Sequence, residues 1–543
     1  MSMLLRCLFG VAAVGVDSLR GAPRLARGLE RRAVARGAVG AEAVDRLDVL
    51  FVVGPGASQF GKTSPQPSSS WHAVATHLCD RLPNFDARIV GTVAGGAAGA
   101  APDVVVALGL TDAAALEAVL SGAPKKPAAV LADVGSCSEA VVKLAYAGSY
   151  RPGVLQDAWA AVVPWGQVAK GKRIANQGKT LLRRYSSEDA VFAALFALHG
   201  LVPGAVIDAV KTDINPSWEK GVIQNVKEFK AMADCCGPEI FAALSDPQTK
   251  SAIDLLNAVD LRDQVGSYRV IVSNETPQLE DFSLCILQQN NCFNADAKIL
   301  EQPRVPALSQ WRGEKLDLKA SKQILVGHLD DVTSGVPAAE RRPWSWKVVT
   351  GANPAYDAFP MQHQIFYPSS NSTGLWYDPV FCVETLEGKL VWTKRHYRCA
   401  PRKHWSGGEG AWTLTTLDNG IVSKEHWTII DAADDLEWFV VHYSGAAKAA
   451  GQSYQGALLC SGDGAWPAKA AAGAGLLRIE AAFARCGLEM WELYGHGPPQ
   501  SAKSFMWSEE YAAFASATPP PLQRIGDQTI TKWRKQQREL ARP

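Results

Sequence analysis

The sequence predicts a multidomain α/β plus all-β chain. An N-terminal open α/β sheet, a helical Cys-containing linker domain and a C-terminal eight-stranded antiparallel barrel with a terminal helix are expected in that order. Apolar runs that alternate with helical patterns indicate the first part, and short alternating runs between turn residues indicate the last. A length of 543 residues also calls for more than one domain.

The N-terminal segment, residues 1–45, has the composition of a targeting sequence. Residues 1–40 contain seven Arg and no Lys, and their only acids are Asp17 and Glu30. Arg-rich, acid-poor segments of this kind are typical of organelle transit peptides. We therefore expect a plastid address, with a disordered tail as the alternative.

The α/β domain is expected over 46–212. A helical pattern at 111–120 lies between two of its strands, and such alternation predicts a parallel sheet with helices on both faces. The predicted strands are the apolar runs Leu47–Val53, Ala87–Val93, Asp103–Leu108 and Ala128–Ala132.

One motif follows the first predicted strand. The run from Gly56 to Thr63 reads GASQFGKT and matches the phosphate-binding pattern GxxxxGK[ST], in which Lys62 and Thr63 would hold phosphate and magnesium. Such a site needs a helix that starts directly at the Lys. Pro65 and Pro67 would interrupt that helix, so a polar surface loop is the favoured interpretation and nucleotide binding the alternative.

The middle of the chain is predicted to be a helical domain, 213–300, followed by a linker, 301–342. Helical patterns occur at Trp218–Met232, Pro238–Leu244 and Lys250–Val259. The eleven Cys of the chain are scattered, without the paired spacing of a zinc site, so no metal site is predicted.

The barrel is expected over 343–500, and a basic C-terminal tail covers 501–543. A helical segment, Gly473–Cys486, follows the last strand, and a strand meander with a terminal helix is the lipocalin plan. Eight strands of this kind can close around one small ligand. The predicted strands are Trp344–Thr350, Met361–Tyr367, Trp376–Thr385, Lys389–Arg398, Ala411–Leu417, Val422–Ile430, Leu436–Ser444 and Tyr454–Cys460.

A long stretch, about 230–495, resembles the violaxanthin de-epoxidase family, and the branch called violaxanthin de-epoxidase-related protein above all. The family pattern is a Trp, then G-x-N-P-x-[FY]-D-x-F, then a Gln. The matching stretch here is WSWKVVTGANPAYDAFPMQHQIFY, and DQVGSYRVIVSNE and DNGIVSKEHWTIIDAADDLEW continue the resemblance. Trp346 stands where lipocalins keep a Trp that plugs the barrel floor.

The resemblance implies an oxidoreductase of the xanthophyll cycle, in the chloroplast and at or within the thylakoid. It implies an epoxy-carotenoid substrate such as violaxanthin, with ascorbate as the cosubstrate that supplies electrons. Opening the epoxide requires a proton donor. Catalytic roles would carry over to Asp357, Gln362 and Glu425, and a turn cap or a rim charge is the alternative for the two acids.

Substrate binding would carry over to aromatic side chains of the same stretch. The candidates are Tyr356, Phe359, Trp427 and Tyr454. A disulfide between Cys285 and Cys292 is the pair that the family's cysteine-rich helical domain makes most plausible here.

Several family positions are replaced. The family His after the conserved Gln is Gln364, and two family tyrosines fall at Ser423 and Cys460. A carotenoid- or lipid-binding lipocalin without catalysis therefore stays an alternative, and a nucleotide-linked regulator is a weaker one.

The expected partners follow from charge and family. A formal net charge of +1 provides no general attraction to nucleic acid, so none is expected. The tail ITKWRKQQRELARP is expected to be solvated, with contact to a thylakoid lipid surface as the alternative. Pairing of two barrels into a homodimer is left open.

Overall fold

The computed structural model describes the chain in segments. These are residues 47–58, 60, 69–80, 82, 85–91, 102–110, 128–132, 134, 142–147, 177–178, 180–184, 187, 189–193, 212–214, 226–257, 259, 262–337, 340–342, 344–353, 359–369, 373–402, 408–418 and 420–495. The predicted targeting segment, the helical pattern at 111–120 and the C-terminal tail lie outside the described residues.

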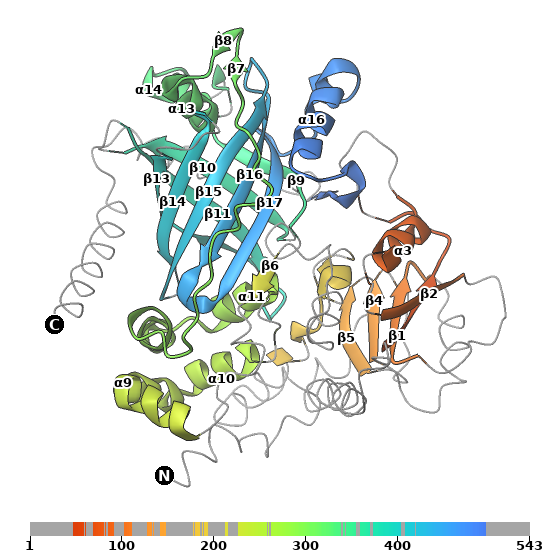
Figure 1. The fold of residues 1–543 in the computed structure, drawn as a ribbon, viewed down its shortest axis with the longest axis vertical. Helices are drawn as coiled ribbons and strands as arrows, with labels where there is room; N and C mark the ends of the chain where they lie inside the picture. Colours follow the sequence, from red (N-terminus) through yellow and green to blue (C-terminus); the bar gives the residue numbers. More distant parts are fainter. Residues whose placement is uncertain are drawn as a thin grey trace.

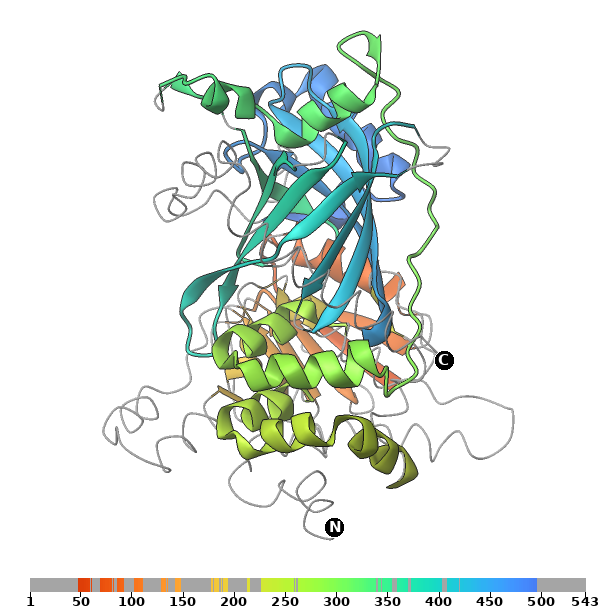
Figure 2. The same cartoon turned by 90° about the vertical axis from the view of Figure 1, so that its left-hand side faces the viewer.

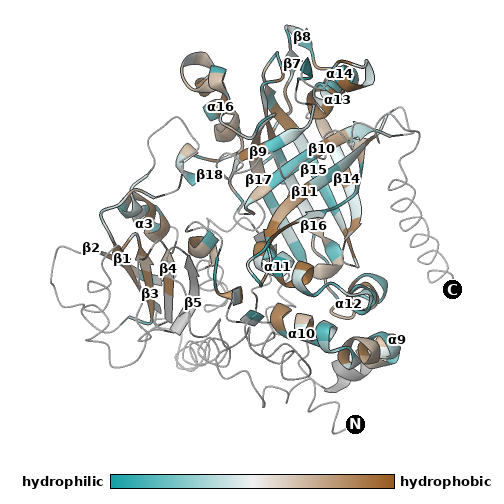
Figure 3. Cartoon of the chain, turned by 180° about the vertical axis from the view of Figure 1, so that it is seen from behind, coloured by the Kyte–Doolittle hydropathy of each residue, from teal (hydrophilic) through white to brown (hydrophobic). Residues whose placement is uncertain are grey.

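The N-terminal part is an open parallel sheet, as predicted. Its strand order is β2-β1-β3-β4-β5, and all four pairings are parallel. Helix α3 (Trp71–Asp80) packs against it. The central strands β1 and β3 are buried and largely hydrophobic (Figure 3), as both faces of a buried parallel sheet require. The strands are β1 (Leu47–Val53), β2 (Phe85–Gly91), β3 (Val104–Leu108), β4 (Ala128–Ala132) and β5 (Val142–Ala147). The last was not predicted, because Lys143 interrupts its apolar run.

The carboxyl ends of β1 and β3 meet at the position where doubly wound sheets bind ligands. Here Trp71 is fully buried between the loops that follow the two strands. Gly109 has a φ of +62°, and a Cβ on it would lie 2.7 Å from Trp71 Nε1. Lys62 and Thr63 lie outside the described residues, and the described helix after β1 begins only at Trp71, capped by Ser70. Nucleotide binding stays a prediction.

The helical region contains α9 (Val226–Ser245), α10 (Pro247–Leu256), α11 (Gln264–Asn274), α12 (Pro277–Ser283) and a π-helical turn, η2 (Leu284–Gln289). Helix α9 is kinked where Cys236 has non-helical φ and ψ, two residues before Pro238. Asp246, Asp263 and Thr276 cap the three helices that follow. Most of the predicted helix Trp218–Met232 precedes the described part of α9.

The predicted disulfide between Cys285 and Cys292 is wrong. Cys285 is bonded to Cys236, with a Cα–Cα distance of 6.0 Å, and Cys292 is a free thiol. Cys285 lies in η2, which packs on α9, and this packing places Cys236 of α9 opposite it. The backbone N–H of Cys292 bonds the carbonyl of Ile286, so the chain turns away after η2.

The C-terminal part is a closed antiparallel barrel with a terminal helix, α16 (Gly473–Arg485), as predicted (Figure 1). Each strand pairs with the next, and β17 returns to β9 to close the sheet. A short strand, β6 (Thr212–Ile214), adds to β17 at the predicted domain boundary. The barrel strands are β9 (Trp346–Gly351), β10 (Met361–Pro368), β11 (Leu375–Glu384), β13 (Tyr397–Pro401), β14 (Ala411–Asp418), β15 (Ile421–Ala432), β16 (Trp438–Ala447) and β17 (Gln452–Ser461).

One predicted strand is divided in two. The run Lys389–Arg398 forms β12 (Leu390–Lys394) and β13, and both pair with β11. The break lies opposite Pro379, which has no N–H with which to continue the ladder.

Helix α13 (Leu318–Val326) closes one end of the barrel. The indole N–H of Trp346 bonds the carbonyls of Ile324 and Leu325 at 3.1 and 2.9 Å. Trp412 Nε1 donates to Ser321 Oγ at 2.9 Å. Figures 1 and 2 show α13 at one end of the barrel and the helical region at the other. Trp346 therefore lies at the closed floor of the barrel, as predicted from the position of the lipocalin Trp.

Residues 295–309, called the strap below, run along the outside of the barrel between the helical region and β7 (Gln310–Trp311) (Figure 1). Backbone groups hold it at both ends, where Ala297 N–H bonds Lys448 O and Leu308 N–H bonds Ile429 O. Between them, Ser444 Oγ donates to the Leu300 carbonyl at 2.7 Å. The strap therefore covers the outer faces of β15 and β16.

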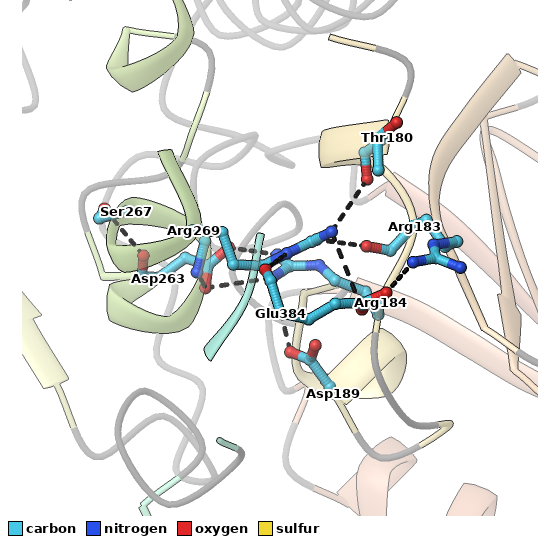
Figure 4. Close-up of polar contacts among 9 residues, drawn as sticks. Thr180, Arg183, Arg184, Asp189, Asp263, Ser267, Arg269 and Glu384 are labelled. Carbon is cyan, nitrogen blue, oxygen red and sulfur yellow. Dashed lines mark hydrogen bonds and ion pairs between the residues drawn. The ribbon is translucent and has the colours of Figure 1, made fainter. Parts of the chain in front are cut away.

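A buried charge cluster connects all three parts of the chain. Arg184, from the N-terminal half, pairs with Asp189 and with Asp263 at the start of α11. Arg269 of α11 donates to the carbonyls of Glu384, Arg183 and Thr180. Figure 4 shows the two guanidinium groups among these acids and carbonyls. The charges are satisfied only when the three parts are docked.

In the described residues, none of the helices has the length and apolar character needed to cross a membrane.

Candidate functional site in the barrel

Strand alternation directs a small group of polar side chains into the barrel. Glu425 and Trp427 are two residues apart on β15 and so share a face. Trp427 belongs to the aromatic cluster that fills the barrel with Phe366, Tyr377 and Tyr443. Glu425 is therefore an interior carboxyl, and it is 8% exposed.

Three donors from three strands hold the Glu425 carboxylate. Tyr454 Oη of β17 donates to Oε1 at 2.7 Å, and Tyr397 Oη of β13 donates to the same oxygen at 3.3 Å. Trp427 Nε1 donates to Oε2 at 2.8 Å. Both carboxyl oxygens are engaged, so the group has a defined orientation.

A glycine on the intervening strand allows this contact. Gly445 of β16 lies opposite Glu425 on one side and Tyr454 on the other. A Cβ at Gly445 would lie 2.5 Å from two carbons of the Tyr454 ring and 2.7 Å from its hydroxyl. The ring therefore crosses β16 over a residue that has no side chain.

Burial sets the proton affinity of this group. Removal from water raises the pKa of Glu425 above its ordinary value, and the bonds from Tyr454, Trp427 and Tyr397 offset only part of that increase. Burial, with the nearby Glu425 charge as the next cause, also raises the pKa of Tyr377 well above its ordinary value. The site therefore favours the protonated form of the Glu425 carboxyl and the neutral form of the Tyr377 phenol.

A second polar chain lies on β10 and β11. Tyr377 Oη donates to Gln364 Oε1, and Gln364 Nε2 donates to Gln362 Oε1 at 3.3 Å. Gln362 is 5% exposed. Of the predicted site residues, Gln362, Glu425, Trp427 and Tyr454 thus gather inside the barrel.

The other predicted residues lie elsewhere or outside the described residues. Phe359 is fully buried, but it packs on Tyr268 and Phe381 in a cluster shared with the α/β sheet rather than among the rings of the barrel interior. Tyr356 and Asp357 fall outside the described residues, so their roles stay predictions.

Sequence reasoning did not identify Tyr377 or Tyr397 as site residues. Each stands at an interior position of its strand, and Tyr377 lies opposite Tyr397 in the ladder between β11 and β13. The alternation of each strand shows that these rings face inward. Their convergence with Glu425 depends on closure of the sheet.

The described residues contain no cluster of three or more His, Cys, Asp or Glu side chains arranged to hold a metal ion. The polar groups inside the barrel are instead suited to proton transfer and hydrogen bonding.

Three comparisons with known proteins bear on this site. Residues 228–493 match the family model described as VDE lipocalin domain. Among solved structures, the chain is similar to one reported as "The Siderocalin Ex-FABP functions through dual ligand specificities", at 12% identity and a TM-score of 0.21. That match covers 29% of this chain and 94% of the other. No curated protein matches the chain.

Proposed function

Residues 228–493 belong to the violaxanthin de-epoxidase family, and on that premise we propose that the chain is an oxidoreductase that removes the epoxide oxygen from a xanthophyll. The family and its lipocalin domain support a role in holding a small apolar ligand. The particular substrate, an epoxy-carotenoid such as violaxanthin, and the reductant, ascorbate, are part of the proposal. So are a plastid location at the thylakoid and pairing of two copies.

The reaction requires two protons and two electrons for each epoxide. Both C–O bonds break, the oxygen leaves as water, and a carbon–carbon double bond extends the polyene. Oxidation of ascorbate to dehydroascorbate supplies the electrons and balances the protons. The protein must deliver a proton to the epoxide oxygen while it excludes bulk water.

The observation that carries the proposal is the buried Glu425 carboxyl. It lies inside the lipocalin-type barrel, its orientation is set by Tyr397, Trp427 and Tyr454, and its pKa is raised. A protonated carboxyl at this position is a proton donor for an epoxide oxygen that enters the barrel. We propose that Gln362 orients a substrate oxygen, and Asp357 remains a second candidate acid.

One observation favours a carotenoid- or lipid-binding protein without catalysis as the second candidate. The family His position is Gln364, which is committed to Tyr377 and Gln362 and cannot titrate near neutral pH. A pigment could then bind without conversion.

The deciding experiment incubates the full-length protein with violaxanthin, ascorbate and thylakoid-type lipid at pH 5 and pH 7.5. We expect antheraxanthin and zeaxanthin to form at pH 5. The rate should fall as the pH rises through the folded pKa of Glu425, because the proton donor is then lost. Glu425→Gln keeps the size of the side chain but has no acidic proton, so it should lose at least about 100-fold in rate and still bind pigment.

Glu314→Gln, at an exposed site between β7 and α13, is the matched control and should keep the wild-type rate. Stable pigment binding with no conversion, under conditions where a known de-epoxidase is active, would reject the enzyme and support the binding protein. Conversion that is unaffected by Glu425→Gln would remove Glu425 from the reaction.

A further inference from the structure

A second polar pocket lies on the outside of the barrel, beneath the strap. It is small and open to solvent. The strap forms one wall and the outward faces of β15 and β16 form the other, so this pocket is separate from the Glu425 site. Its lining consists of Leu300, Glu301, Pro303, Val305, Arg402, His426, Thr428, His442 and Ser444.

Strand register places the two histidines at diagonal positions on neighbouring strands. His426 lies opposite Ser444, and Thr428 lies opposite His442, in the ladder between β15 and β16. These four side chains alternate with the interior residues Trp427 and Tyr443, so they point outward together. Two imidazoles and two hydroxyls therefore form the floor of one pocket.

His442 is a largely buried residue whose ring nitrogens open onto the pocket. It is 7% exposed, and within the described part of the chain neither of its ring nitrogens has a hydrogen bond, ion pair or ring contact. A buried imidazole normally has at least one such partner. A bound ligand at the floor of this pocket would supply it.

The charges around the pocket are mainly positive. Arg402, which directly follows β13, lines it, and Lys424 lies near His426. The acidic lining residue, Glu301, is on the exposed strap and pairs with Arg304 at 3.5 Å. Glu301 also acts on Arg402 as a counter-charge, so an anion in the pocket would compete with that carboxylate for the guanidinium.

We propose that this pocket is a binding site for a small oxyanion, held between Arg402 and the paired imidazoles of His426 and His442. Ser444 already donates its hydroxyl proton to the strap at Leu300, so the Thr428 hydroxyl is the donor that completes the floor. A tetrahedral oxyanion and a planar carboxylate share this chemistry. An occupied site would join the strap to the barrel wall.

Binding should be coupled to proton uptake. Burial lowers the pKa of His442 to about 4, and burial with Arg402 and Lys424 lowers that of His426 to about 4. Both imidazoles are therefore neutral in the empty pocket at pH 7. An anion beside them favours the protonated ring, so affinity should rise as the pH falls, by about tenfold per pH unit for each proton taken up.

The test is calorimetric titration of the full-length protein with sulfate, whose charge is constant over this range, at pH 5, 6 and 7.5 and fixed ionic strength. A parallel titration with formate separates tetrahedral from planar anions. We expect saturable binding that strengthens toward pH 5, with proton uptake visible in buffers of different ionisation enthalpy. Absence of saturable binding of both anions at pH 5 would overturn the proposal and leave a water-filled pocket.

Variants locate the site. His442→Gln should remove about one proton from the pH dependence. Arg402→Gln should weaken binding at every pH and, because Arg402 lowers the pKa of His426, should also move the pH dependence toward higher pH. His72→Gln, at an exposed histidine of α3, is the matched control and should leave both unchanged. If His442→Gln and Arg402→Gln both bind the anions as tightly as wild type does, the proposed site is rejected. Neither readout depends on the proposed de-epoxidase activity.

Discussion

At the scale of single residues, the barrel interior is organised around one carboxyl group. Glu425 is buried among aromatic rings, and its three donors come from its own strand and from two others. Such a group is most stable when protonated, because its charged form loses hydration that three hydrogen bonds only partly replace. This property has consequences for stability as well as for chemistry.

The first residue-scale prediction concerns pH and stability. Because the folded pKa of Glu425 is raised, its contribution is complete below the unfolded pKa and is lost as the pH rises through the folded pKa. Glu425→Gln should therefore gain stability relative to wild type between pH 5 and pH 7.5. Urea unfolding of both proteins at both pH values measures this. The same difference in free energy of unfolding between variant and wild type at pH 5 and pH 7.5 would contradict the prediction.

The second residue-scale prediction concerns Gly445. A methyl group there must displace the Tyr454 ring, so Gly445→Ala should cost about 1–3 kcal/mol. It should also weaken the bond from Tyr454 to Glu425 and slow the proposed reaction. Gly237→Ala is the control, because a Cβ at Gly237 meets nothing within 4 Å. Equal melting temperatures for the two variants would show that Tyr454 can move freely.

At the scale of elements, the helical region depends on one covalent bond between α9 and η2. The bond closes a loop with a sequence separation of 49 residues, and the chain-entropy account assigns such a bond about 4 kcal/mol. Free Cys292 and exposed Cys235 lie close to it.

We predict that Cys236→Ala destabilises the helical region by about 2–4 kcal/mol, and that a reductant has the same effect on wild type and none on the variant. Hydrogen exchange in α9 and η2 measures the loss. Cys235→Ser is the adjacent control and should retain both the bond and the protection. Unchanged exchange in Cys236→Ala would mean that packing alone holds η2.

At the scale of the whole molecule, the buried charge cluster makes the three parts interdependent. Arg184 is 8% exposed and Arg269 is 1% exposed, so each needs its partners to remain buried. Burial opposes the charge on Arg184, but Asp263 and then Asp189 outweigh it and raise the pKa of Arg184. Burial, with Arg184 as the next cause, lowers the pKa of Arg269 to about 10. Undocking any part would leave a guanidinium or a carboxylate unpaired.

We predict that Asp263→Asn costs on the order of 3–5 kcal/mol by leaving Arg184 short of a counter-charge. Asn can still cap α11, so the loss of stability measures the missing charge and not a weakened helix end. Urea unfolding should show the α/β part separating from the barrel. Asp254→Asn, which breaks the exposed pair with Lys250, should cost less than about 0.5 kcal/mol. Similar costs for the two variants would exclude a docking role.

The amino-acid sequence by itself determined the fold class, the order of the parts and nearly every barrel strand. Alternation has a period set by the backbone of each strand, so the strands could be located from local pattern, whereas Glu425, Trp427 and Tyr454 were proposed from the family resemblance. Trp346 could likewise be placed at the barrel floor. The division of the predicted strand 389–398 into β12 and β13 could not be read from its own residues, because it is caused by Pro379 of the neighbouring strand β11.

Only the tertiary structure decided which of these residues meet. Tyr397 reaches Glu425 because the sheet closes, and Tyr454 does so because Gly445 leaves space between them. Cys285 joins Cys236 rather than Cys292 because η2 packs on α9, and the strap forms a pocket because it crosses His426 and His442. Each of these contacts joins segments far apart in the chain, and no local pattern specifies their packing.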